Sequence, residues 1–266
     1  MYSDIETQTS YEYLEKVVSI LQEPICLLGG WAIYLTVNDK YKEIIGMPYL
    51  GSRDIDLGFH LNKNSGKKEM RESSFGLALK ELEEDGFEPI SFRLAKYLDR
   101  ETGRALSKEE YSKKDPFELI NMYVDLIVDN IPGGFKETFK MNPIDETLLE
   151  HVFEKPENHI HLTEFKKKLI LPNPTLLLST KLKSLPNRDK EDKKKKDICD
   201  IVALLLYATT RIAGNELLQF LPREQVLKSI DQISDQEMQT TDYALGLQKN
   251  QAKTAILNLK KQLNNQ

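Results

Sequence analysis

The stretch LLGGWAIYLTVNDKYKEIIGMPYLGSRDIDLGFHL, residues 27–61, sets the architecture expected for the whole chain. It begins inside a short apolar run, Ile25–Leu28, of the kind that forms a buried strand. Two glycines follow, and a helix-like segment starts at Trp31. A second apolar run then carries the tetrapeptide Asp-Ile-Asp-Leu at residues 54–57. The stretch therefore predicts a strand, a glycine turn, a helix and a second strand.

The second strand is expected to present two carboxylates together. Side chains alternate between the two faces of a strand, so Asp54 and Asp56 share one face while Ile55 and Leu57 occupy the other. Neighbouring carboxylates repel each other and lose solvation when they are partly buried. A divalent cation beside them is the simplest way to keep both ionised. Hard oxygen ligands favour Mg²⁺, which also takes oxygens from substrate phosphates.

The glycine pair, Gly29-Gly30, suits a phosphate. A residue without Cβ lets the backbone approach a ligand closely. The helix N-terminus that follows offers unpaired N–H groups and a partial positive charge. A phosphate cradle and a metal-binding carboxylate pair within one unit indicate chemistry on a nucleoside triphosphate.

The segments GGWAIYL and SRDIDL together resemble the nucleotidyltransferase superfamily that includes DNA polymerase beta. The residues of these two segments are most similar to those of its abortive-infection type toxin branch. The resemblance implies an α/β (α+β) fold with a small mixed sheet flanked by helices and a helical C-terminal part. We expect a nucleotidyltransferase-like catalytic domain at residues 1–145 and a mainly helical domain at residues 146–266 that closes the cleft.

A third carboxylate, Asp125, lies in the next strand candidate, FELINMYVDLIV at residues 117–128. A lone carboxylate in so apolar a run needs a partner. The resemblance makes Asp125 the third metal ligand, on the strand beside Asp54 and Asp56. The alternatives are a residue on the solvent side of an edge strand, or one paired with an arginine. Asp129, where the strand is expected to end, is a nearby rival.

A second group of charged residues also resembles the toxin branch, and it comprises Lys181, Arg188, Lys196, Asp197 and Asp200. Lys181 would neutralise the triphosphate and the charge that develops on the pyrophosphate leaving group. Arg188 would grip a phosphate bidentately, and Asp197 would orient one of these cations or position the acceptor. The alternative is an ordinary charged helical surface.

Four consecutive lysines, Lys193–Lys196, form the most basic stretch of the chain. Runs of this kind are usually solvated loops, and an RNA- or acceptor-binding patch is the other interpretation. The net charge is −5, so any contact with nucleic acid would need such a local patch.

The composition, with 40% hydrophobic and 30% charged residues among 266, is typical of a soluble globular protein. No apolar run approaches the roughly 20 residues of a membrane span, and the N-terminus lacks the features of a secretory signal. Cys26 and Cys199 lie in apolar contexts. We expect both to be buried free thiols in a reducing cytoplasm.

The sequence therefore predicts a nucleotidyltransferase with a two-ion Mg²⁺ site, Mn²⁺ being the alternative ion, that moves a nucleoside monophosphate to a hydroxyl acceptor. The acceptor is tRNA or other RNA, a protein side chain or a small molecule. Ser52 is expected to add a hydroxyl contact, and Arg53 to brace the strand or touch phosphate. Resemblance to the toxin branch suggests a toxin with an antitoxin partner. The alternatives are an antibiotic-type small-molecule transferase, a non-catalytic nucleotide-binding protein, and a structural protein with a stabilising ion.

Overall fold

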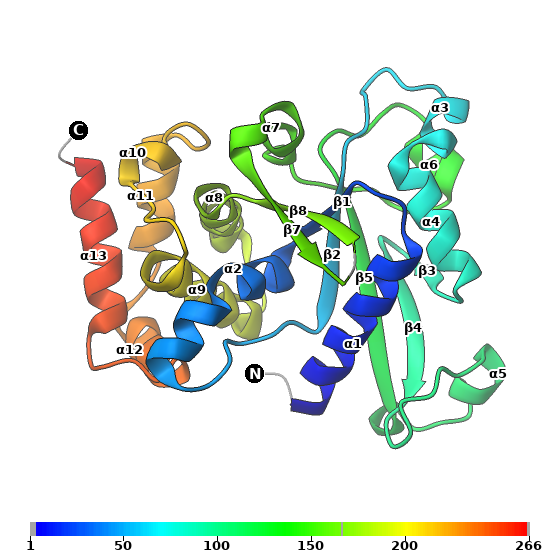
Figure 1. Ribbon diagram of the computed structural model, residues 1–266, viewed down its shortest axis with the longest axis horizontal. Coiled ribbons are helices and arrows are strands. Elements are labelled where there is room, and N and C mark those ends of the chain that lie inside the picture. The colour runs from blue at the N-terminus through cyan, green and yellow to red at the C-terminus, as the bar shows by residue number, and fades with distance from the viewer. Residues whose placement is uncertain (1–3, 166, 265–266) are drawn as a thin grey trace. The chain divides into compact units, whose positions relative to one another are not determined.

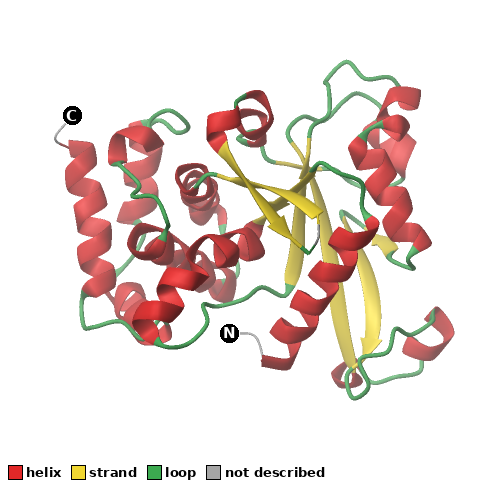
Figure 2. Cartoon of the chain, viewed as in Figure 1, coloured by secondary structure: helices red, strands yellow, loops and turns green. Residues whose placement is uncertain are grey.

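The computed structural model describes residues 4–165 and 167–264 (Figures 1 and 2). The chain divides into two compact units. We call residues 4–31 and 51–171 the sheet unit, and residues 32–50 and 172–264 the helical unit. These bounds differ from the expected division after residue 145, because two further strands beyond that point extend the sheet and residues 32–50 pack with the C-terminal helices.

Eight strands of the described residues form one mixed sheet in the order β3-β4-β5-β2-β1-β8-β7, with β6 paired to β5. The strands are β1 (Ile25–Leu28), β2 (Asp54–Phe59), β3 (Glu88–Ile90), β4 (Arg93–Asp99), β5 (Leu119–Val128), β6 (Ile144–Asp145), β7 (His159–Glu164) and β8 (Lys167–Pro172). At the centre, β2 is parallel to β5 and antiparallel to β1. The predicted mixed sheet is confirmed, and it is larger than the small sheet expected.

Helices and short 3-10 turns of the sheet unit accompany the strands. They are α1 (Asp4–Ile20), α3 (Lys67–Glu72), α4 (Ser74–Glu84), α5 (Lys108–Tyr111), α6 (Phe135–Phe139) and α7 (Leu149–Glu154), with 3-10 turns η1 (Pro116–Glu118) and η2 (Pro156–Asn158). Helix α1 packs against β2 and β5 (Figure 1). Ile55 and Leu57 of β2 are fully buried, which fixes the opposite face of β2 for its polar residues.

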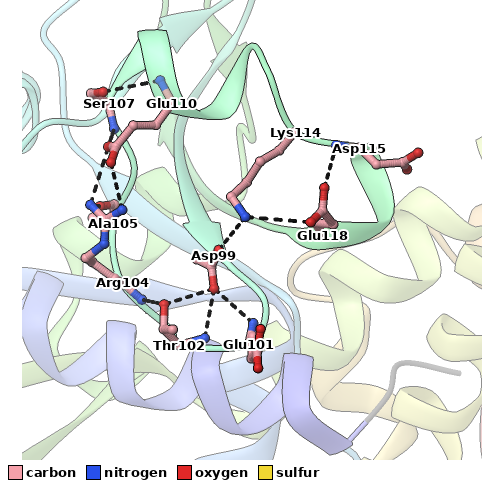
Figure 3. Close-up of polar contacts among 10 residues, drawn as sticks. All are labelled: Asp99, Glu101, Thr102, Arg104, Ala105, Ser107, Glu110, Lys114, Asp115 and Glu118. Carbon is pink, nitrogen blue, oxygen red and sulfur yellow. Dashed lines mark hydrogen bonds and ion pairs between the residues drawn. The ribbon is translucent and has the colours of Figure 1, made fainter.

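Polar contacts order the connection between β4 and β5 (Figure 3). Asp99 accepts hydrogen bonds from the backbone N and the hydroxyl of Thr102, both at 2.9 Å, and its other oxygen lies 2.7 Å from Lys114 Nζ. Arg104 and Glu110 form a second ion pair at 2.7 Å. The Lys114 and Thr102 contacts hold the pKa of Asp99 well below its usual range.

The helical unit confirms the helical C-terminal part predicted from the sequence. Most of α2 (Gly29–Ile45) belongs to it. The other helices are α8 (Pro174–Ser184), the 3-10 turn η3 (Leu185–Asn187), α9 (Glu191–Tyr207), α10 (Gly214–Leu217), α11 (Arg223–Asp231), α12 (Asp235–Ala244) and α13 (Gln251–Asn264). The Tyr41 ring lies 5.2 Å from the rings of Tyr49 and Tyr207, and its hydroxyl donates to the Leu245 carbonyl at 3.0 Å. These contacts fasten residues 32–50 to the C-terminal helices.

Both cysteines are buried free thiols, as the sequence predicted. Burial raises the pKa of Cys199 to about 11, so its thiol stays protonated near neutral pH. Within the described part of the chain, no helix has both the length and the apolar character that crossing a membrane requires.

Candidate active site

Three carboxylates meet on one face of the sheet unit. Asp54 and Asp56 lie on β2, and Asp56 is the register partner of Asp125 on the parallel strand β5. Residues paired in register on neighbouring strands point to the same face. All three carboxylates therefore lie opposite the buried Ile55 and Leu57. The side chains of Asp54 and Asp125 are 14% and 11% exposed, so their charges are only partly solvated.

Arg93, the first residue of β4, bridges the carboxylates of two strands. Its Nη2 atom lies 2.7 Å from Asp125 Oδ2 and 3.7 Å from Asp54 Oδ2. The guanidinium carbon is 4.5 Å from the centre of the Tyr123 ring, on the residue two before Asp125 in β5. Among the interpretations of Asp125, pairing with an arginine is therefore realised in the structure.

The charge of Arg93 is held in place by the acidic cluster. Burial of the guanidinium acts to lower its pKa, but three negative charges outweigh this effect and raise the pKa above the ordinary value. The contributing charges are those of Asp125, Asp54 and Asp56, with the hydrogen bond to Asp125 adding to them. A second guanidinium, that of Arg53, places its Nε atom 3.9 Å from Asp54 Oδ1. The guanidinium groups of Arg93 and Arg53 thus lie beside the three carboxylates.

The carboxylates have the chemistry that suits a hard divalent ion. Oxygen donors from adjacent strands are the ligands that Mg²⁺ takes. Asp54 Oδ1 is buried and accepts no hydrogen bond from any residue that the structure describes. Over residues 4–165 and 167–264, however, no group of three or more His, Cys, Asp or Glu side chains is already placed to hold a metal ion. Arg93 lies among the oxygens that an ion would use, so binding requires a local side-chain shift.

Gly29 and Gly30 form a corner, here called the glycine corner, beside the acidic face that carries Asp54, Asp56 and Asp125. Leu28 of β1 is the register partner of Asp56, so the chain turns into α2 directly beside that carboxylate. Gly29 has a φ of +60°, and a Cβ atom there would lie 1.7 Å from Asp56 Oδ2. A Cβ on Gly30 would lie 2.8 Å from the Ser52 hydroxyl. Only glycine fits both the backbone conformation and the space at position 29.

The segment before β2 is anchored by a chain of hydrogen bonds. The Trp31 indole N–H donates to the Ser10 hydroxyl at 3.0 Å, and Ser10 in turn donates to the Arg53 carbonyl at 3.1 Å. The Ser52 hydroxyl donates to the Asp54 carbonyl at 3.0 Å, and Ser52 is buried. Trp31 is 1% exposed. It acts as a core anchor for this segment, and Ser52 uses its proton within its own loop.

The second predicted group forms a buried ion-pair cluster in the helical unit. Lys181 Nζ of α8 lies 2.6 Å from Asp197 Oδ1 and 2.8 Å from Asp200 Oδ2, both on α9. The side chain of Lys181 is 12% exposed, that of Asp197 is 3% exposed and that of Asp200 is fully buried. Burial acts to lower the pKa of Lys181, but the two carboxylates outweigh it and raise the pKa.

Further cations complete the ion-pair cluster. The chain turns at η3 between α8 and α9, yet Arg188 Nε still reaches Asp197 Oδ2 at 2.5 Å. Lys196 Nζ lies 2.5 Å from Asp200 Oδ1, which also accepts a hydrogen bond from the Tyr49 hydroxyl at 2.7 Å. Asp197 and Asp200 therefore hold three cations from α8, α9 and the turn between them. This arrangement is more buried than the ordinary charged surface considered from the sequence.

The lysine run Lys193–Lys196 was expected in a loop, and the structure corrects this, because α9 begins at Glu191. Lys194 pairs with Glu237 at 2.6 Å, Lys195 with Glu191 at 2.8 Å, and Lys196 joins the ion-pair cluster. The side chains turn to several partners around the helix, so much of the charge of the run is offset within the helical unit.

One residue of the site was not identified from the sequence. Arg93 was missed, although the lone carboxylate of Asp125 signalled that a cation would lie nearby. Asp129, the rival ligand, is 1% exposed and has its own role. It accepts a hydrogen bond from the Leu61 backbone N at 2.8 Å and contacts His60 Nδ1 at 2.5 Å, so it fixes the segment after β2.

Comparison with known proteins gives one structural likeness to report. No protein-family model matches the sequence, and no curated protein matches it. A solved structure, described as "Crystal structure of an antigenic nucleotidyltransferase-like protein from Paracoccidioides brasiliensis", aligns with 93% of this chain and 95% of its own. The identity is 16% and the TM-score is 0.45. At these values the likeness assigns neither a family nor an activity to the present chain.

Proposed function

We propose that this protein is a metal-dependent nucleotidyltransferase that moves a nucleoside monophosphate from a triphosphate to a hydroxyl acceptor. The observation that supports this most strongly is the meeting of Asp54, Asp56 and Asp125 on one face of two paired strands. The glycine corner at the start of α2 touches the same face. Acidic ligands for a metal and backbone N–H groups for phosphate are the two requirements for handling a metal–triphosphate complex.

In the proposed reaction the acceptor oxygen forms a bond to the α-phosphorus. The bond from that phosphorus to the bridging oxygen breaks, and pyrophosphate leaves with the electron pair while the hydroxyl proton passes to solvent. Backbone N–H groups at Gly29 and Gly30 would donate to phosphate oxygens. Mg²⁺ or Mn²⁺ held by the three carboxylates would supply positive charge to the triphosphate. Roles for Lys181, Arg188 and Asp197 at the phosphates stay predictions from the sequence, as does a role as a toxin.

The test is incubation with each of four α-labelled nucleoside triphosphates, Mg²⁺ and total cellular RNA. Wild type is compared with Asp56→Ala and with Asp145→Ala, an exposed carboxylate on β6 that serves as the matched control. We expect label on RNA with wild type and with Asp145→Ala, and its loss with Asp56→Ala. Label on the protein itself would point to self-modification. Absence of both label and triphosphate binding with wild type would exclude the proposed function.

A small-molecule acceptor, the second candidate, would need a pocket in the C-terminal helices, and the helical unit has a cavity. The cavity measures about 460 Å³ and lies between the C-terminal end of α9 and α13. Leu205, Ile212 and Leu259 give it an apolar lining, and Arg211 and Lys261 add positive charge. Its volume is that of ordinary small-molecule sites. Replacing the RNA with a panel of aminoglycosides in the labelling assay tests this candidate directly.

A further inference from the structure

The contacts of Arg93 contain more than a structural ion pair. Its Nη2 atom lies 2.7 Å from Asp125 Oδ2 and 3.7 Å from Asp54 Oδ2, so one nitrogen is shared by carboxylates of two strands. The Arg93 side chain is 17% exposed, and the guanidinium cannot lose its proton in a protein. A positive charge is therefore always present at the point where a metal ion would bind these oxygens.

We propose that Arg93 is a built-in counter-ion that competes with divalent metal for Asp54 and Asp125, so that the site takes metal together with triphosphate and not metal alone. The inference rests on the proposed function, since it concerns the same acidic face. A bare ion must displace Arg93 and then lie beside an unneutralised guanidinium. Two cations at such close range in a partly buried site repel each other strongly. A metal–triphosphate complex removes this obstacle, because its phosphates supply negative charge for the displaced guanidinium.

Two aromatic rings contact the Arg93 guanidinium beside its carboxylate partners. Its guanidinium carbon lies 4.5 Å from the centre of the Tyr123 ring and 5.1 Å from that of the Phe92 ring. Guanidinium groups bind favourably over aromatic faces. Tyr123 is two residues from Asp125 along β5 and therefore lies on the same face of the sheet. These ring contacts are separate from the ion pair, so they would keep Arg93 beside the site after it leaves Asp125, where it would meet an incoming phosphate.

The experiment measures metal binding by equilibrium dialysis of the full chain against Mn²⁺, with and without a non-hydrolysable triphosphate analogue. Wild type is compared with Arg93→Gln and with Arg104→Gln, an exposed arginine in the connection between β4 and β5. We expect Arg93→Gln to bind bare Mn²⁺ at least ten-fold more tightly than wild type or the Arg104→Gln control. The analogue should raise the Mn²⁺ affinity of wild type at least ten-fold and that of Arg93→Gln much less.

Thermal unfolding gives a second readout that does not depend on activity. Without metal, Arg93→Gln should melt below wild type because its carboxylates repel one another, and Mn²⁺ should restore the midpoint in the variant alone. Equal affinity of wild type and Arg93→Gln for bare Mn²⁺ would overturn the role of Arg93 and leave the metal site standing. If Arg93→Gln fails to fold, wild type alone decides, because binding of bare Mn²⁺ as tight as binding with the analogue overturns the inference. If wild type bound Mn²⁺ neither with the analogue nor without it, the proposed function would be refuted instead.

Discussion

Replacing Lys181 with methionine is the sharpest test of how the helical unit is held together. The substitution keeps a similar side-chain volume and removes one buried positive charge. Lys181 contacts Asp197 at 2.6 Å and Asp200 at 2.8 Å, and these two carboxylates are almost completely buried. Without the lysine they face each other with less compensation. We therefore expect Lys181→Met to destabilise the protein whether or not Lys181 has a role in catalysis.

The magnitude follows from the contacts that remain. Removing one partner of a buried ion pair costs about 3–5 kcal/mol. Asp197 keeps Arg188 and Asp200 keeps Lys196, so we expect the lower end, about 3 kcal/mol. For a chain of this length such a loss lowers the thermal midpoint by about 6–12 °C.

The assay is urea unfolding followed by circular dichroism, with Lys195→Met as the matched control. Lys195 lies on α9, the helix that carries Asp197 and Asp200, and pairs with the largely exposed Glu191, so Lys195→Met should leave the urea midpoint close to that of wild type. Lys181→Met with the stability of wild type would refute the buried-cluster reasoning. It would refute it even if the variant were inactive, because the lysine would then serve chemistry alone.

The pH dependence of the same comparison has a definite sign. Burial acts to raise the pKa of Asp200, but Lys181 and Lys196 outweigh it and lower the pKa. The stability that Asp200 contributes is therefore present above its ordinary pKa of 3.8 and is lost as the pH falls through the folded value. The raised pKa of Lys181 means that its contribution is complete below its ordinary pKa of 10.5 and is lost as the pH rises through the folded value. The difference in unfolding free energy between wild type and Lys181→Met should be constant near neutral pH and should become smaller below about pH 4.

Two further predictions concern the sheet unit. Gly29→Ala should lower the free energy of unfolding by about 1–3 kcal/mol, because φ is +60° and the new Cβ would overlap the Asp56 carboxylate. The control Gly133→Ala has open space around the new Cβ and should leave the urea midpoint unchanged. An equal midpoint for the two variants would contradict the close approach at the glycine corner. The pKa of Asp99, followed by NMR of its carboxyl carbon, should lie well below the usual range. Lys114→Met should raise this pKa, because the contact with Lys114 is the main cause of the lowering. A titration that Lys114→Met leaves in place would show that the hydrogen bonds from Thr102 are sufficient.

The local pattern of the sequence predicted much of the acidic face correctly. The period of two in β2 placed Asp54 and Asp56 opposite Ile55 and Leu57, and the structure has this alternation. The apolar run around Asp125 was correctly predicted to be a strand. The lysine run was wrongly placed in a loop, because charge composition alone does not reveal that the first turns of α9 find acidic partners along and beside the helix.

Residue types and their short-range spacing thus determined strands β1, β2 and β5, the glycine corner, the buried thiols and the shared face of two carboxylates. These features depend on backbone geometry over a few residues, and such geometry is visible in one dimension. Only the tertiary structure decided that Asp125 pairs in register with Asp56, that Arg93 stands between the strands, and that Asp197 and Asp200 collect cations from several segments. Strand register and buried charge pairing join residues far apart in the chain, and they are settled by the packing of the whole fold.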